Sequence, residues 1–224
     1  MEHPQISCVE IGSPKAIELR RYALVDLIMR RYSAYFRPKT PEWFPTRKAA
    51  QVVAYFAIKA GGRINVLLCS KLVSLADRLS MERRDYSITG DNFVSMDFGP
   101  VASNTYDYMK GNASVRQGEW AEFVAPRDNY DLPLAKGVTT DILDELSRSD
   151  LKILAETWDK FSDIDKYELA EWTHQFCPEW RDPGRSSIPI EFPDLFKELG
   201  KEDPDELAQD LESERKLKLT LFTR

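Results

Sequence analysis

The stretch that decides the fold is YSITGDNFVSMDFGPV, residues 86–101. Thr89-Gly90-Asp91 has the composition of a tight turn, because glycine supplies the positive φ that such turns need. Residues 92–98 alternate in character and predict a short strand. Gly99-Pro100 then breaks the strand and turns the chain into a helix, because proline fixes φ and lacks a backbone donor. Gly90, Asp91, Gly99 and Pro100 are therefore structural residues, and the stretch carries no motif for catalysis or phosphate binding.

Outward from this stretch, apolar residues recur at helical spacing and predict a mainly α protein with a small antiparallel β-element, an α+β fold. Helices are expected at residues 17–36, 47–59, 64–79, 150–161, 165–176, 193–199 and 205–216, and a further helix, capped by Ser103 or Asn104, is expected to end at Gly111. Thr46 is the expected N-cap of the second of these, and Ser147 or Ser149 caps the helix that starts at residue 150.

Further strands are expected at residues 119–125 and 130–134, on either side of a turn-like Arg127-Asp128-Asn129. These two strands could join residues 92–98 in one antiparallel sheet. The last residues, 216–222, alternate apolar and polar side chains with a period of two. That pattern is typical of a strand, and such a strand needs a sheet edge, in this chain or in a partner, with which to pair.

Charge is distributed unevenly along the 224 residues, although the net charge is only −6. Residues 1–140 hold 19 basic and 15 acidic side chains, a net of +4, and residues 141–224 hold 12 basic and 22 acidic, a net of −10. An acidic C-terminal third argues against nucleic acid as a partner and favours a basic or amphipathic protein. A solvated acidic surface that serves only solubility is the alternative.

Three cysteines, Cys8, Cys69 and Cys177, are far apart and never paired as Cys-x-x-Cys, which indicates a reducing compartment. The sequence shows neither a signal peptide nor an uninterrupted apolar run long enough for a membrane span. We therefore expect a cytoplasmic protein without a membrane partner.

Chemistry has one candidate centre, His174 with Cys177 three residues on and Glu171 three residues before. A zinc site needs three or four ligands at recognisable spacing, and only two strong ligands come close together here. The alternative is a structural histidine at a helix end, where the helix dipole stabilises it. We expect both residues to be dispensable for chemistry, and we expect no catalytic residue, metal or cofactor.

A proline-rich connector, with Pro38, Pro41 and Pro45, separates the first predicted helix from the second. Its large apolar pair, Trp43-Phe44, either packs as a staple onto the next helix or lies exposed and binds a partner. The preceding helix has a basic flank that includes Arg30 and Arg31.

The order of several short motifs resembles the Panacea domain, the SocA-like, antitoxin-associated family. The motifs are KA at 48–49, YF at 55–56, LVSLAD at 72–77, ITGD at 88–91, FGPV at 98–101, YD at 106–107, KG at 110–111, LSRSD at 146–150, YEL at 167–169, TH at 173–174, PEW at 178–180 and IPI at 188–190. The resemblance divides the chain into residues 1–45, a leader, helix and connector; 46–200, the Panacea-like domain; and 201–224, an acidic helix with an amphipathic tail.

The resemblance implies an antitoxin, not an enzyme, that neutralises a co-encoded protein toxin by direct binding. A proteolytic adaptor that delivers the toxin to a cytoplasmic protease is the alternative, and a metal-dependent hydrolase using His174 and Cys177 is a third hypothesis. Aromatic and arginine side chains anchor interfaces, which makes seven residues candidates for toxin binding. They are Arg30, Arg31, Trp43, Phe44, Phe98, Tyr106 and Tyr108.

Overall fold

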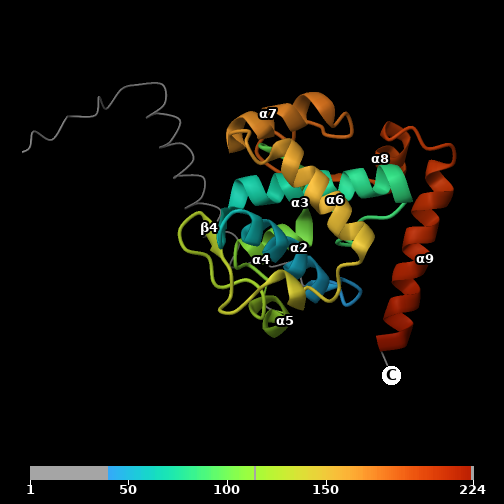
Figure 1. Ribbon diagram of the computed structural model, residues 1–224. Coiled ribbons are helices and arrows are strands. Elements are labelled where there is room, and N and C mark those ends of the chain that lie inside the picture. Colours follow the sequence, from blue (N-terminus) through green and yellow to red (C-terminus); the bar gives the residue numbers. More distant parts are fainter. Residues whose placement is uncertain (1–39, 114, 223–224) are drawn as a thin grey trace, which may run out of the picture. The chain divides into compact units, whose positions relative to one another are not determined.

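The computed structural model describes residues 40–113 and 115–222, which belong to one compact unit, Lys39–Arg224. The predicted helix at 17–36, with Arg30 and Arg31, lies outside the described residues. Figure 1 shows a mainly helical arrangement, which confirms the predicted fold class. The described α-helices are α2 (Thr46–Lys59), α3 (Val66–Arg84), α4 (Ser103–Met109), α5 (Gln117–Ala121), α6 (Arg148–Phe161), α7 (Lys166–Phe176), α8 (Phe192–Glu198) and α9 (Pro204–Phe222), and a 3-10 turn, η1, spans Thr140–Ile142.

Two small antiparallel sheets accompany the helices. The first has the strand order β3-β2-β5, formed by β2 (Phe93–Met96), β3 (Gly99–Ala102) and β5 (Ile188–Ile190). The second pairs β1 (Arg63–Asn65) with β4 (Asp131–Pro133). The predicted strands at 92–98 and 130–134 are therefore confirmed in outline. The expectation of one shared sheet is wrong, because β4 pairs with β1, a three-residue strand that overlaps the start of the helix predicted at 64–79.

Residues 119–125 form no strand, which corrects the second strand prediction. Residues 117–121 form helix α5, and Val124 makes only an isolated bridge with Leu134. Trp120, Phe123 and Val124 follow the three- and four-residue spacing of a helical turn, and all three are buried. Burial of this face against Tyr108, whose ring stacks on that of Trp120 at 4.9 Å, outweighs the period-two pattern.

Gly99-Pro100 does not break the strand. It opens β3, which returns antiparallel to β2 after the two-residue turn Asp97-Phe98, with Met96 opposite Gly99. Gly99 has a φ of +93°, a conformation that glycine adopts without steric cost. Pro100 is tolerated because β3 is an edge strand of its sheet, where a missing N–H is not needed for pairing.

The C-terminal residues extend α9 to Phe222, so the predicted strand-like tail is wrong. Leucine, lysine and glutamate favour helix, and the ion pairs Glu212–Lys216 (3.9 Å) and Glu214–Lys218 (2.7 Å) connect successive turns. The alternation of residues 216–222 is accommodated by leaving Leu217 60% exposed. A strand-addition role for this tail is no longer supported.

The helix caps partly follow the sequence. Ser147 caps α6, and its side chain and that of Asp150 form a reciprocal capping box. Thr46, in contrast, is the first residue of α2 and not its cap, because Pro45 occupies that position without a side-chain bond. The core lies between α2 and the helices around it. Phe56 on α2 and Leu72 on α3 are fully buried, and α3 packs against α6, α7 and β3.

Candidate functional site

Asp91, in the Thr89-Gly90-Asp91 turn, is a fully buried carboxylate that organises the start of α4. One of its oxygens accepts hydrogen bonds from the backbone N–H groups of Asn92 (2.7 Å) and Asn104 (3.0 Å) and from the Asn104 amide (2.7 Å). The other accepts from the backbone N–H (2.7 Å) and the hydroxyl of Thr105 (2.8 Å). Asp91 therefore caps α4, a helix that begins twelve residues later. Ala102, the residue directly before α4, has no side chain that could make this hydrogen bond.

Asp77, on α3, holds the other side of the same turn. A single oxygen of its fully buried carboxylate accepts the N–H groups of Ile88 (2.7 Å) and Thr89 (2.9 Å), and the other accepts the Thr89 hydroxyl. Burial raises the pKa of Asp77 to about 7, against the opposing effect of these hydrogen bonds. The two aspartates fix the turn from opposite sides, and Gly90, with a φ of +64°, allows its backbone conformation.

Lys71 lies beneath the Gly99-Pro100 motif and is fully buried. Its ammonium group donates to the Pro100 carbonyl at 2.8 Å, and the Ser74 hydroxyl donates to the same oxygen at 3.0 Å. No carboxylate forms an ion pair with Lys71 within the described part of the chain. Burial consequently lowers the pKa of Lys71 to about 7.

Replacing Lys71 with methionine is expected to stabilise the protein by roughly 2–4 kcal/mol at pH 7, because a buried amine without a counter-ion is exchanged for an apolar chain of similar length. The Ser74 hydroxyl lies 3.0 Å from the Pro100 carbonyl and 2.7 Å from that of Ser70, and in the variant its single proton can turn to Pro100. The pKa of Lys71 in the folded state lies below the unfolded value of about 10.5. The buried amine therefore destabilises the folded state most below pH 7, and this destabilisation disappears as the pH rises toward 10.5. Urea unfolding at pH 7 and pH 10 should show the advantage of Lys71→Met shrinking. A gain of equal size at both pH values would contradict this assignment.

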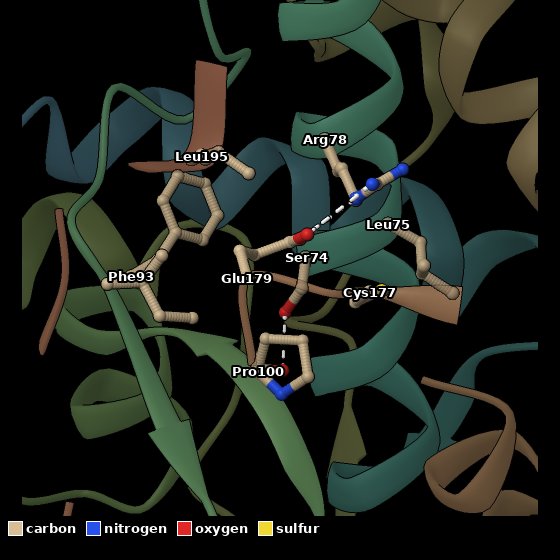
Figure 2. A pocket seen from close by; sticks show the side chains of 9 residues that line it. Ser74, Leu75, Arg78, Phe93, Pro100, Cys177, Glu179 and Leu195 are labelled. Atoms are coloured by element: carbon tan, nitrogen blue, oxygen red, sulfur yellow. Dashed lines mark hydrogen bonds and ion pairs between the residues drawn. The ribbon is translucent and has the colours of Figure 1, made fainter. Parts of the chain in front are cut away.

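Beside this motif lies a small cavity of about 10 Å³, drawn in Figure 2. Glu179 reaches across it to the guanidinium of Arg78 at 2.8 Å, and the thiol of Cys177 lies on its wall. This volume holds about one water molecule, far less than the several hundred Å³ of a substrate pocket. The cavity is therefore a packing feature of the fold.

His174 and Cys177 do not come together with a third metal ligand. The described residues contain no group of three or more histidine, cysteine, aspartate or glutamate side chains that could hold a metal ion. The His174 ring stacks on that of Trp180 with centroids 4.0 Å apart, and its Nδ1 lies 3.7 Å from Glu171. Burial raises the pKa of the Cys177 thiol to about 12, so the thiol stays protonated and unreactive at neutral pH. That both are dispensable for chemistry stays a prediction.

Two of the aromatic residues proposed for toxin binding lie in the core. Phe44 is 0% exposed and stacks on Tyr108 (centroids 6.0 Å apart), which is itself 2% exposed. Tyr108 also shares a hydrogen bond of 3.3 Å with Thr46 on α2. The Phe44 ring is therefore buried against Tyr108 on α4, which is not the helix that the staple interpretation named, and neither of these two side chains is exposed to a partner.

The three other aromatic candidates are half-buried. Trp43 lies edge-on to Phe44 (6.4 Å). The ring of Phe98, at the hairpin turn, lies 6.1 Å from that of Tyr167, and Lys110 lies over the ring of Tyr106 at 4.3 Å. These three come from separate places in the fold, and their toxin-binding role stays a prediction.

Helix α7 carries two exposed aromatic side chains that the sequence did not indicate as partner contacts. Tyr167 is 47% and Phe176 53% exposed, and Phe176 stacks on Trp172 with centroids 4.7 Å apart. At about 100° per residue, residues 167 and 176 project from opposite sides of the helix. Glu168 and Glu171 lie between them and are exposed, because the opposite face, with Leu169, Ala170 and Thr173, is buried.

We call Tyr167, Glu168, Glu171, Trp172 and Phe176 the α7 surface. Its middle is acidic and both flanks are aromatic. Lys160 lies over the ring of Trp172 at 5.8 Å, and Lys166 lies over that of Tyr167 at 4.7 Å, which shows that these rings accept cations. The sequence could have indicated this surface, because Tyr167 and Phe176 stand near the two ends of the helix and lie outside its buried face of Leu169, Ala170 and Thr173.

The geometry defines a mainly helical domain in which the buried polar residues of the central motif hold a turn, a hairpin and a helix in place. The chain belongs to the family described as antitoxin SocA-like, Panacea domain, whose model matches residues 70–181, half of its length. This confirms the resemblance noted in the sequence. The motifs at 48–56 and 188–190 lie outside the matched residues. No curated protein and no solved structure matches the chain. None of the described helices has the length and hydropathy of a membrane span.

Proposed function

We propose that the protein is an antitoxin that neutralises a protein toxin by direct, stoichiometric binding. The family match over residues 70–181 is the observation that carries the proposal. The interior supports it, because Asp77, Asp91 and Lys71 are engaged with the backbone of their own domain.

We further propose the α7 surface as the main contact with the toxin. It lies within the matched residues and combines exposed aromatic rings with carboxylates. A partner surface with lysine or arginine opposite Glu168 and Glu171 fits this arrangement, because the charges attract while the cations also stack on the flanking rings. The net charge of −10 over residues 141–224 extends the attraction to longer range.

Replacing Tyr167 or Phe176 with alanine is expected to weaken toxin binding about tenfold or more each, because exposed aromatic side chains are frequent interface anchors. Both rings contribute little to the core, so the melting temperature should stay close to that of the wild type. Titration calorimetry with the purified product of the neighbouring gene measures the affinity, and rescue of growth arrest on co-expression measures neutralisation.

Tyr130→Ala is the matched control, since Tyr130 is also an exposed aromatic residue (63%) but lies next to β4 and not on α7. If Tyr130→Ala weakens binding as strongly, or if a Tyr167→Ala/Phe176→Ala double variant binds normally, the α7 surface is not the interface. Loss of binding only in Arg30→Ala/Arg31→Ala would move the interface to the N-terminal region. Absence of any complex with the toxin would overturn the antitoxin proposal itself. Rescue that requires a host protease would favour the adaptor alternative.

A further inference from the structure

Arg215, on α9, lies on the central turn of the family motif although α9 itself is outside the matched residues. Its guanidinium donates to the carbonyl oxygens of Gly90 (3.0 Å) and Asp91 (3.1 Å) and to the side-chain oxygen of Asn92 (2.7 Å). The same group lies over the ring of Trp43 at 3.9 Å. The Trp43 connector and the C-terminal helix therefore meet at one place, and the sequence offered each of these segments as a contact for a protein partner.

A second ring completes the site. Phe192, the first residue of α8, lies 4.8 Å from the Arg215 guanidinium carbon. Two aromatic faces and three oxygen acceptors thus surround one planar cation, and guanidinium is the side-chain group whose donors and stacking faces match such an arrangement. We call Trp43, Gly90, Asp91, Asn92 and Phe192 the arginine site.

Arg215 is held there without a counter-ion. All three of its hydrogen-bond acceptors are neutral oxygens, and no ion pair involving Arg215 occurs among the residues that the structure describes. Desolvation lowers the pKa of Arg215, although the Asp91 carboxylate nearby opposes the shift. Removing a cation from water without pairing it offsets much of the gain from hydrogen bonds. Displacing the guanidinium therefore breaks neutral hydrogen bonds and ring contacts but no ion pair.

The distal half of α9 has no fully buried side chain within residues 209–220. The helix packs mainly against α8, and Ala208, in its first turns, is its only buried residue within Pro204–Thr220. Figure 1 shows α9 running along one side of the described residues, with its end directed away from α8. Arg215 ties this half of the helix to the motif.

We propose that the arginine site is a recognition site for an arginine side chain of a protein partner, which Arg215 occupies in the free protein and must vacate. The chemistry of the site indicates a guanidinium group as its ligand, because the side chain bound there is itself an arginine. This inference rests on the proposed function only in taking the toxin as the partner that supplies the competing arginine.

The site can be tested without any toxin by adding methylguanidinium to the full-length Arg215→Ala variant. Methylguanidinium should raise the variant's melting temperature saturably and more than methylammonium, which carries the same charge without the planar fork. In the wild type the apparent affinity should be about tenfold weaker or more, because Arg215 occupies the site. Trp43→Ala in the Arg215→Ala background should abolish the effect. Equal responses to both cations, or to methylguanidinium in wild type and variant, would overturn the site.

If Arg215→Ala folds poorly, Arg215→Gln offers a second variant that keeps an amide donor and much of the side-chain length. A second experiment measures the affinity of these variants for the toxin. Arg215→Ala should tighten the complex, because the competing arginine is gone, and Trp43→Ala should loosen it. Opposite signs support exchange at this site. Unchanged toxin affinity in both variants, despite binding of methylguanidinium, would show that the toxin does not use the site, and would leave the antitoxin proposal standing.

Discussion

The substitution Asp91→Asn is expected to destabilise the protein by about 3 kcal/mol or more, whereas Asp77→Asn should cost about 1 kcal/mol or less. Both changes replace a fully buried carboxylate by its neutral isostere. Both oxygens of Asp91 accept a backbone N–H, so an amide at this position must direct its own N–H groups at another donor. At Asp77 one oxygen takes both backbone bonds, and the amide can donate to the Thr89 hydroxyl instead.

Chemical unfolding at pH 7 measures the two free-energy changes directly, and Asp91→Ala and Asp77→Ala give the cost of losing every bond. If burial of the charge alone decided the cost, the two asparagine variants should be destabilised by similar amounts, since burial raises the pKa of both carboxyl groups. Equal destabilisation by the two asparagine variants would mean that charge, and not the pattern of donors, determines the role of these residues.

Alanine at position 99 is expected to cost about 3 kcal/mol or more, because two unfavourable effects add. Gly99 has a φ of +93°, where side chains are strained, and a Cβ there would lie 2.1 Å from the Thr173 hydroxyl and 3.3 Å from the Lys71 ammonium. The hairpin would have to move away from α7 and α3 to relieve the contact. The loss is measured as a lower melting temperature and a lower free energy of unfolding.

Gly111→Ala is the matched control, since Gly111 has a similar φ of +74° but nothing within 4 Å of a Cβ. It should show the backbone cost alone, about 1–2 kcal/mol. Thr173→Ala should recover part of the stability of Gly99→Ala by removing the clashing hydroxyl. Losses of the same size at positions 99 and 111 would show that close approach to Thr173 is unimportant.

Helix positions and fold class could be predicted from the sequence, because they depend on local spacing. The apolar faces of α2, α6, α7 and α8 repeat every three or four residues, and Ser147 and the turn at Gly90 carry local chemistry that fixes a cap and a positive φ. The strand at Phe93–Met96 alternates clearly. Such patterns are formed by neighbours in the chain and need no knowledge of distant contacts.

Strand pairing and the roles of polar residues were decided by the tertiary structure. Whether residues 119–125 fold as helix or strand depends on Tyr108, against which Trp120 packs, and whether β4 joins one sheet or the other depends on β1, more than sixty residues away. Burial of Phe44 and the place of Arg215 on Trp43 likewise depend on contacts between distant segments.

The sequence by itself thus determined most of the described helices, the central turn and the family, because these are encoded by short-range periodicity and by residues of special conformation. Helix α5 and the last turns of α9 are the exceptions. Tertiary structure decided that Asp91 caps a helix in a later segment, that Gly99 opens a hairpin against Thr173, and which aromatic side chains remain exposed on α7. The physical reason is that the free energy of burying a ring or pairing a carboxylate depends on partners that only the folded chain brings within reach.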